Sequence, residues 1–215
     1  MASVAEETAR PISASIENWN RKLHIYAGLY FLVSIWLFSL SGLILNHPKW
    51  KFAEFWEQRK QTPFQRSIVP PTQPLPFDQA RDLKNQLGLS GELEWNANRQ
   101  TPGRLDFRVS GPKGFFEVKA DLEKRIANVN KVEFNVWGTL NVLHHMKVVD
   151  PDNPEQPRNW VWTRLWGLSV DALSVGLIFM TLSGIYMWRG KRRGLAGILA
   201  LALGVLGCGV FLLRY

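Results

Sequence analysis

Three apolar runs constrain this 215-residue chain more than any other feature. They extend from about His24 to Leu45, from about Leu165 to Trp188 and from about Leu195 to Leu213. A helix needs about 20 mostly apolar residues to cross a hydrocarbon core of roughly 30 Å, and each run provides about that length. We therefore expect a membrane protein with three transmembrane helices. Because a polar segment precedes the first run, we expect that run to be a retained helix rather than a cleaved signal.

Aromatic and basic residues gather at the ends of these runs. Tryptophans at such positions form the belt expected at a membrane–water boundary. The formal net charge is +8, but its compact clusters, Arg21-Lys22 and Arg189–Arg193, adjoin the runs, so no nucleic-acid surface is expected. Cytoplasmic loops carry the excess of Lys and Arg, which predicts a cytoplasmic N-terminus and an external segment from His47 to Arg164. The flanking tryptophans are Trp19, Trp50, Trp160, Trp162, Trp166 and Trp188.

The external segment predicts a small α+β domain. Prolines after the first run (Pro63 to Pro76) indicate an extended linker, and the spacing of apolar residues predicts a helix over 77–87, ended by Gly88. Alternating residues then predict an antiparallel sheet with strands at 92–96, 104–109, 115–120 and 125–129. The expected core is Leu83, Leu87, Leu93, Trp95, Leu105, Phe107, Val109, Phe116 and Val118.

A further helix is predicted over 134–146, lying on the outer membrane surface. Phe134, Trp137, Leu140 and His144 share one of its faces. On this prediction His144 points toward the membrane and His145 toward water or the sheet domain.

All four histidines lie at or beside the apolar runs, and none lies within the sheet domain. Imidazoles at membrane helix ends hold haem iron or relay protons. Histidine is also an amphipathic residue that suits the membrane interface without any ligand. The sequence leaves both interpretations open.

If a haem is bound, helix geometry restricts its ligands. His24 and His47 are 23 residues apart, about 35 Å along a straight helix, so one iron cannot use both. His47 is expected on the same side as His144 and His145, which allows haem b iron between His47 and either of them. An inner haem at His24 would need a partner subunit, a different ligand or an open iron position. Gly28, one turn later, either leaves room for a porphyrin or serves helix packing.

Asp171 is the one carboxylate within the apolar runs. Burying it in a membrane is costly, so it is a candidate functional residue. It shares a helical face with Gly167 and Ser174, where it would orient a ligating imidazole through a hydrogen bond. Alternatively, it lies near the interface and pairs with Arg164.

The third run carries a ridge of small residues at every fourth position: Ala196, Ala200, Gly204 and Cys208. Such a ridge lets another helix approach closely, from this chain or from a second subunit. The single cysteine excludes an intrachain disulfide and a cysteine-based zinc or iron–sulfur site.

Several of these segments resemble PepSY-associated transmembrane proteins. The resemblance runs from Arg21 to Arg189 and implies an inner-membrane protein with a periplasmic PepSY domain. Relatives include siderophore-iron reductases, in which membrane histidines hold b-type haems; the family name also suggests modulation of a peptidase. With only three spans, this chain departs from the larger members, which puts a complete electron path in doubt. The matching motifs are Arg21–His24 with Gly28, Ser41–His47, Leu143–His144, Asp171–Leu173 and Thr181–Arg189.

Two functions follow as hypotheses. In the first, the chain is a haem b electron-transfer component linked to reduction of ferric or siderophore-bound iron. In the second, it is a cofactor-free accessory subunit whose PepSY-like domain binds a partner protein, with the helices meeting lipid, a larger complex or a second copy. The predicted organisation is a cytoplasmic arm (1–22), first helix (23–46), PepSY-like domain with linker (47–132), interfacial helix and linker (133–160), second helix (161–188), basic loop (189–194) and third helix (195–213).

Overall fold

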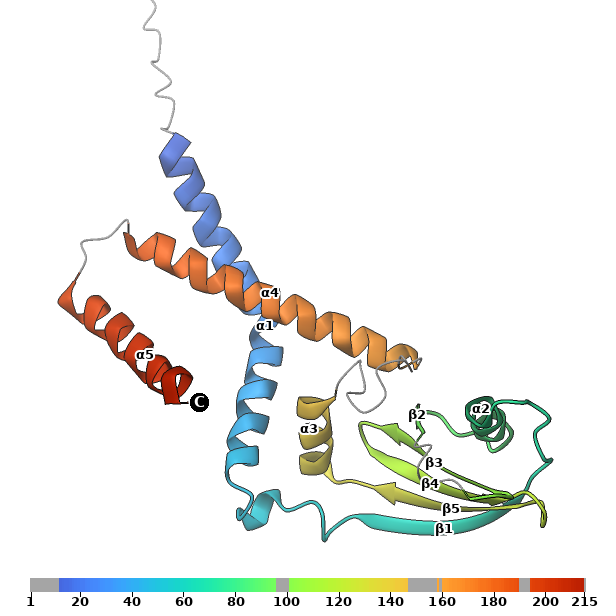
Figure 1. Ribbon diagram of the computed structural model, residues 1–215. Coiled ribbons are helices and arrows are strands. Elements are labelled where there is room, and N and C mark those ends of the chain that lie inside the picture. Colours follow the sequence, from blue (N-terminus) through green and yellow to red (C-terminus); the bar gives the residue numbers. More distant parts are fainter. Residues whose placement is uncertain (1–11, 96–100, 147–157, 159, 190–193, 215) are drawn as a thin grey trace, which may run out of the picture. The chain divides into compact units, whose positions relative to one another are not determined.

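A computed structural model describes residues 12–95, 101–146, 158, 160–189 and 194–214 (Figure 1). The basic loop (190–193), the start of the N-terminal arm and the prolines after 150 lie outside these residues. The chain divides into two compact units. One contains residues up to 33 and from 172 onward, and the other contains residues 34–171.

Three helices are long and apolar enough to cross a membrane. They are α1 (Ile12–Asn46), α4 (Val161–Arg189) and α5 (Leu195–Arg214). Only 11% of the most apolar stretch of α1 and of α4 is buried within the protein, and none of that of α5. Because such a surface is unfavourable in water, these helices are suited to lipid. Helix α1 begins about ten residues before the predicted apolar run, so part of the predicted arm is helical.

The segment between α1 and α4 contains the predicted antiparallel sheet. Its strand order is β1-β5-β4-β3-β2, and every neighbouring pair is antiparallel. Helix α2 (Pro76–Gln86) lies over one face, and it ends before Gly88, whose φ of +67° favours glycine. The strands are β1 (Lys60–Ser67), β2 (Glu92–Glu94), β3 (Arg104–Gly111), β4 (Gly114–Asp121) and β5 (Ile126–Glu133).

The first strand corrects the linker prediction at Pro63. Residues 60–67 pair with β5, and Pro63 lies opposite Asn130. Proline lacks the N–H group that a central strand needs, but β1 is at the edge of the sheet, where that group is dispensable. The prolines at 70, 71 and 74 do precede α2 without regular structure, as predicted for a linker.

The hydrophobic core lies between α2 and the sheet, and the predicted core residues all belong to it. Phe107 is 6% exposed, and Leu83 and Val109 are completely buried. Leu87, Leu93 and Phe116 are partly buried against the same cluster. Six further core residues were not part of the expected core: Ile68, Ala80, Leu89, Ala120, Ala127 and Val129.

Helix α3 (Val136–His145) confirms the helix predicted over 134–146. The Asn135 side chain caps it by accepting a hydrogen bond of 3.0 Å from the Gly138 N–H. A Cβ at Gly138 would lie 2.7 Å from the Cβ of Phe134 and 2.9 Å from the Phe55 ring. The start of α3 is therefore packed too closely for any residue larger than glycine.

Candidate functional site

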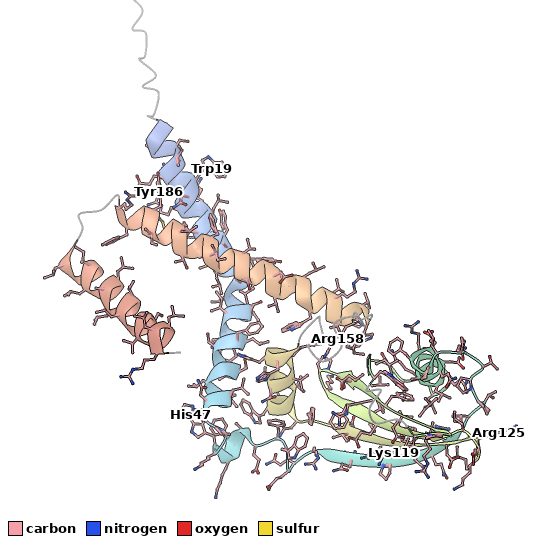
Figure 2. The ribbon with its side chains drawn as sticks, in the orientation of Figure 1. Trp19, His47, Lys119, Arg125, Arg158 and Tyr186 are labelled. Carbon is pink, nitrogen blue, oxygen red and sulfur yellow. The ribbon has the colours of Figure 1, made fainter. Side chains whose placement is uncertain are left out.

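His47 lies just beyond the end of α1, beside the 3-10 turn η1 (Lys51–Ala53) (Figure 2). Its Nδ1 is 2.8 Å from the carbonyl oxygen of Leu43, and its ring stacks on Trp50 with a centroid distance of 4.4 Å. A carbonyl oxygen only accepts, so Nδ1 must donate, and in the neutral ring Nε2 keeps its lone pair. The histidine closes the helix end and leaves one nitrogen available.

An aromatic chain connects His47 to the beginning of α3. Trp50 stacks on Phe52 at 5.3 Å, and Phe52 meets the edge of Trp137 at 5.5 Å. Trp137 is the second residue of α3. Successive ring contacts therefore connect His47 to the first turn of α3.

His144 lies near the other end of α3 and packs against α1. Its Nδ1 is 2.7 Å from the Oγ of buried Ser41, and its ring is 5.5 Å from that of Phe38. A Cβ on Gly42 would lie 3.5 Å from the His144 ring. Loss of water around the ring, and then the neighbouring His145, lower the pKa of His144 below its ordinary value of 6.5. The imidazole is consequently neutral near pH 7 and serves as a packed, hydrogen-bonded contact between two helices.

His145 is exposed, and its Nδ1 donates to the carbonyl oxygen of Asn141 at 3.1 Å. It borders a cavity of about 260 Å³ that is also lined by Glu92, Glu94 and Arg158 of the sheet domain and its approach to α4. His145 thus faces the sheet domain, as predicted.

The positions of His47 and His144 do not favour one iron between them. His144 contacts the Ser41–Gly42 side of α1, and at about 100° per residue position 47 lies roughly on the opposite side. Along α3, Trp137 and His144 are separated by two turns, or about 10 Å, whereas imidazole–metal bonds are about 2 Å. The contacts of the two rings therefore give no support to a shared haem iron, which stays a prediction.

His24 contacts α4 within the other compact unit. Its Nδ1 is 3.2 Å from the Oγ of Ser183, and the Asn20 side-chain amide donates to the Ser183 carbonyl oxygen at 3.4 Å. The space above Gly28 is filled, since a Cβ there would lie 3.4 Å from the terminal methyl of Met180. Gly28 therefore serves helix packing, and no room for a porphyrin remains at that point.

Asp171 is exposed on α4, away from the buried face that carries Leu173 and Ser183. The structure gives it no ion pair with Arg164 among the described residues. No histidine contact to Asp171 is found there either. The carboxylate therefore faces the surroundings of the helix.

Sequence reasoning missed the junction between the sheet domain and α4. The backbone N–H of Trp160 donates to a carboxylate oxygen of Glu92 at 3.1 Å, and Glu92 is only 5% exposed. Trp160 also contacts Gly111 at the end of β3, where a Cβ would lie 3.8 Å from the indole. The Glu92 contact joins residues 68 positions apart, so spacing along the chain could not reveal it.

Comparisons with known proteins found no matching family model, no matching curated protein and no matching solved structure. The resemblance to PepSY-associated transmembrane proteins therefore stays a prediction that rests on the motifs in the sequence.

Proposed function

We propose that this chain is a membrane-anchored accessory protein whose sheet domain docks a partner protein. Its location would be the inner membrane, with the N-terminus in the cytoplasm and a PepSY-like domain in the periplasm. The three apolar helices support the anchoring, and the basic residues beside them support the orientation. No haem is required for this function.

The observation that carries the proposal is the open face of the sheet opposite α2. Register places Gln65, Asn128, Lys119 and Asp106 in one row across four strands, and Pro63, Asn130, Glu117 and Arg108 in the next. Cross-strand contacts order these rows: Gln65 donates to Asn128 at 3.2 Å, and Arg108 pairs with Glu117 at 2.9 Å.

The third row, at Val132 and Phe115, is covered by other residues, so the open face ends there. Phe115 is 5.8 Å from the Phe134 ring just before α3, and its pair partner Val132 is buried. An ordered polar face with amides and charges of both signs suits docking of another polar surface. With neither His nor Cys between residues 48 and 143, the face lacks the usual base or thiol nucleophile of an enzyme.

Site-specific photo-crosslinking tests this function. A photoreactive residue replacing Asn128 on the open face should give one discrete adduct in intact cells. The matched control replaces Asn85, an exposed asparagine on α2. Equal labelling from both positions, or no adduct from Asn128, would contradict a partner on this face.

A haem b electron-transfer role remains the second candidate, favoured by one specific observation. His47 and His145 each donate through Nδ1 to a carbonyl oxygen four residues earlier, which leaves Nε2 able to bind iron. When bound, such a haem would supply one-electron transfer, for instance to ferric or siderophore-bound iron.

A further inference from the structure

The described part of the sheet domain contains a second cavity, of about 390 Å³, at the end of the β3–β4 hairpin. Its volume falls within the range of small-molecule sites, about 300–1,000 Å³. The function proposed above makes no use of it. The lining includes Gly111, Lys113, Phe115, Phe116, Lys131 and Trp160.

The chemistry of the lining is amphipathic. The rings of Phe115, Phe116 and Trp160 provide apolar surface. Lys131 is neutralised by Glu133, with 2.6 Å between Nζ and the carboxylate. Lys113 is exposed and forms no ion pair among the described residues, so the cavity has one uncompensated positive charge at its border.

The cavity borders the residue just before a helix that is long and apolar enough to span a membrane. Trp160 immediately precedes α4, and its carbonyl oxygen accepts from the Thr163 N–H at 3.0 Å. The 29 residues of α4 extend about 43 Å, which matches the roughly 40–45 Å of a bilayer including its headgroups. If α4 spans the membrane, Trp160 and the cavity lie at headgroup level.

We propose that this cavity binds the headgroup end of one anionic phospholipid from the outer leaflet. The phosphodiester would meet Lys113, and the first carbons of the lipid would lie on Phe115, Phe116 and Trp160. The site rests on the membrane-spanning placement in the proposed function, but not on a partner for the sheet face. It would fix the height of the sheet domain above the bilayer.

The test is native mass spectrometry of the full chain released from bilayers of equimolar phosphatidylcholine and phosphatidylglycerol. Wild type should retain one phosphatidylglycerol. Lys113→Gln should reduce that retention about five-fold, the effect expected of one basic residue near an anionic surface. Lys124→Gln is the matched control, since Lys124 is an exposed lysine of the β4–β5 turn outside the cavity lining.

Gly111→Leu tests the cavity itself, because it places a side chain into the space beside Trp160. It should abolish the bound lipid while leaving the circular dichroism spectrum unchanged. If Gly111→Leu does not fold, Lys113→Gln still tests the lipid site, since an exposed lysine can be replaced without loss of packing. Retention unchanged in Lys113→Gln, or displacement of the adduct by excess inorganic phosphate, would overturn the proposal.

Alkaline carbonate extraction separates the two proposals. Extraction of the chain from membranes would contradict the anchoring on which both depend. A chain that resists extraction yet retains no phosphatidylglycerol would contradict the lipid site alone.

Discussion

The four histidines are distinguished by what their Nδ1 atoms contact. Two donate to carbonyl oxygens of their own turn (His47, His145), and two contact serine hydroxyls of another element (His24 with Ser183, His144 with Ser41). The placement of His47, His144 and His145 at helix ends could be predicted from the sequence, but His24 lies within α1, which begins at Ile12. The serine contacts could not be predicted, because His144 and Ser41 are 103 residues apart and His24 and Ser183 are 159 apart.

The partly buried setting of His144 predicts acid sensitivity. Its pKa is lowered from 6.5, so the unfolded chain binds the proton at a higher pH than the folded chain does. The contribution of His144 to the free energy of unfolding is therefore complete above pH 6.5, and it is lost as the pH falls through the lowered pKa. Thermal unfolding of the full chain in detergent should show a drop in the midpoint between about pH 7.5 and about pH 5.

Two histidine variants check the assignment of this effect. His144→Gln should flatten the pH dependence, whereas His47→Gln, at an exposed histidine, should preserve it. Full acid sensitivity in His144→Gln would show that another group is responsible.

At the scale of the elements, the sheet was the most predictable part. Strict alternation fixed four strands, because only one face of each could be buried against α2. The fifth strand was missed because Pro63 indicated a linker, although an edge strand tolerates proline. Small core residues such as Ala120 and Ala127 were missed because alanine carries little hydrophobic signal.

Phe107 tests the strand register. It lies on the core face of β3 opposite Val118 and is 6% exposed. Replacing it by alanine should destabilise the sheet domain by about 3–5 kcal/mol, measured by denaturant unfolding of the full chain. Phe52→Ala is the control, since Phe52 is 60% exposed and should cost much less. Equal losses in both variants would contradict this register.

Gly176 tests the packing of α1 on α4. A Cβ there would lie 2.2 Å from the Phe31 ring, so Gly176→Val must displace that ring. We expect a lower thermal midpoint and faster proteolysis in detergent for this variant. Gly207→Val on α5 should behave as wild type, since a Cβ at Gly207 has nothing within 4 Å and this residue is not part of the ridge of small residues. A stable Gly176→Val variant would argue against the contact.

At the scale of the whole molecule, the assignment to a membrane depends on three apolar helices that are largely exposed and on the basic residues beside them. The number of helices long enough to cross a membrane could be predicted because each apolar run is long. The proposed docking face and the cavity at Trp160 could not be predicted, because they arise from strand register and long-range contacts. Asp171 remains without a structural role among the described residues.

Reporter fusions test the orientation. A reporter active only in the periplasm should function after Lys131 and fail when placed within residues 189–193, since basic loops stay in the cytoplasm. Activity only at the second position would reverse the topology and remove the periplasmic partner from the account.

The most direct test of the central claim is the visible spectrum of the purified full chain, expressed with haem supplied, before and after dithionite. Docking without a cofactor predicts a preparation with no Soret band in either state. A Soret band with a sharp reduced α-band, lost in His47→Ala or His145→Ala, would contradict the account and establish the haem protein instead.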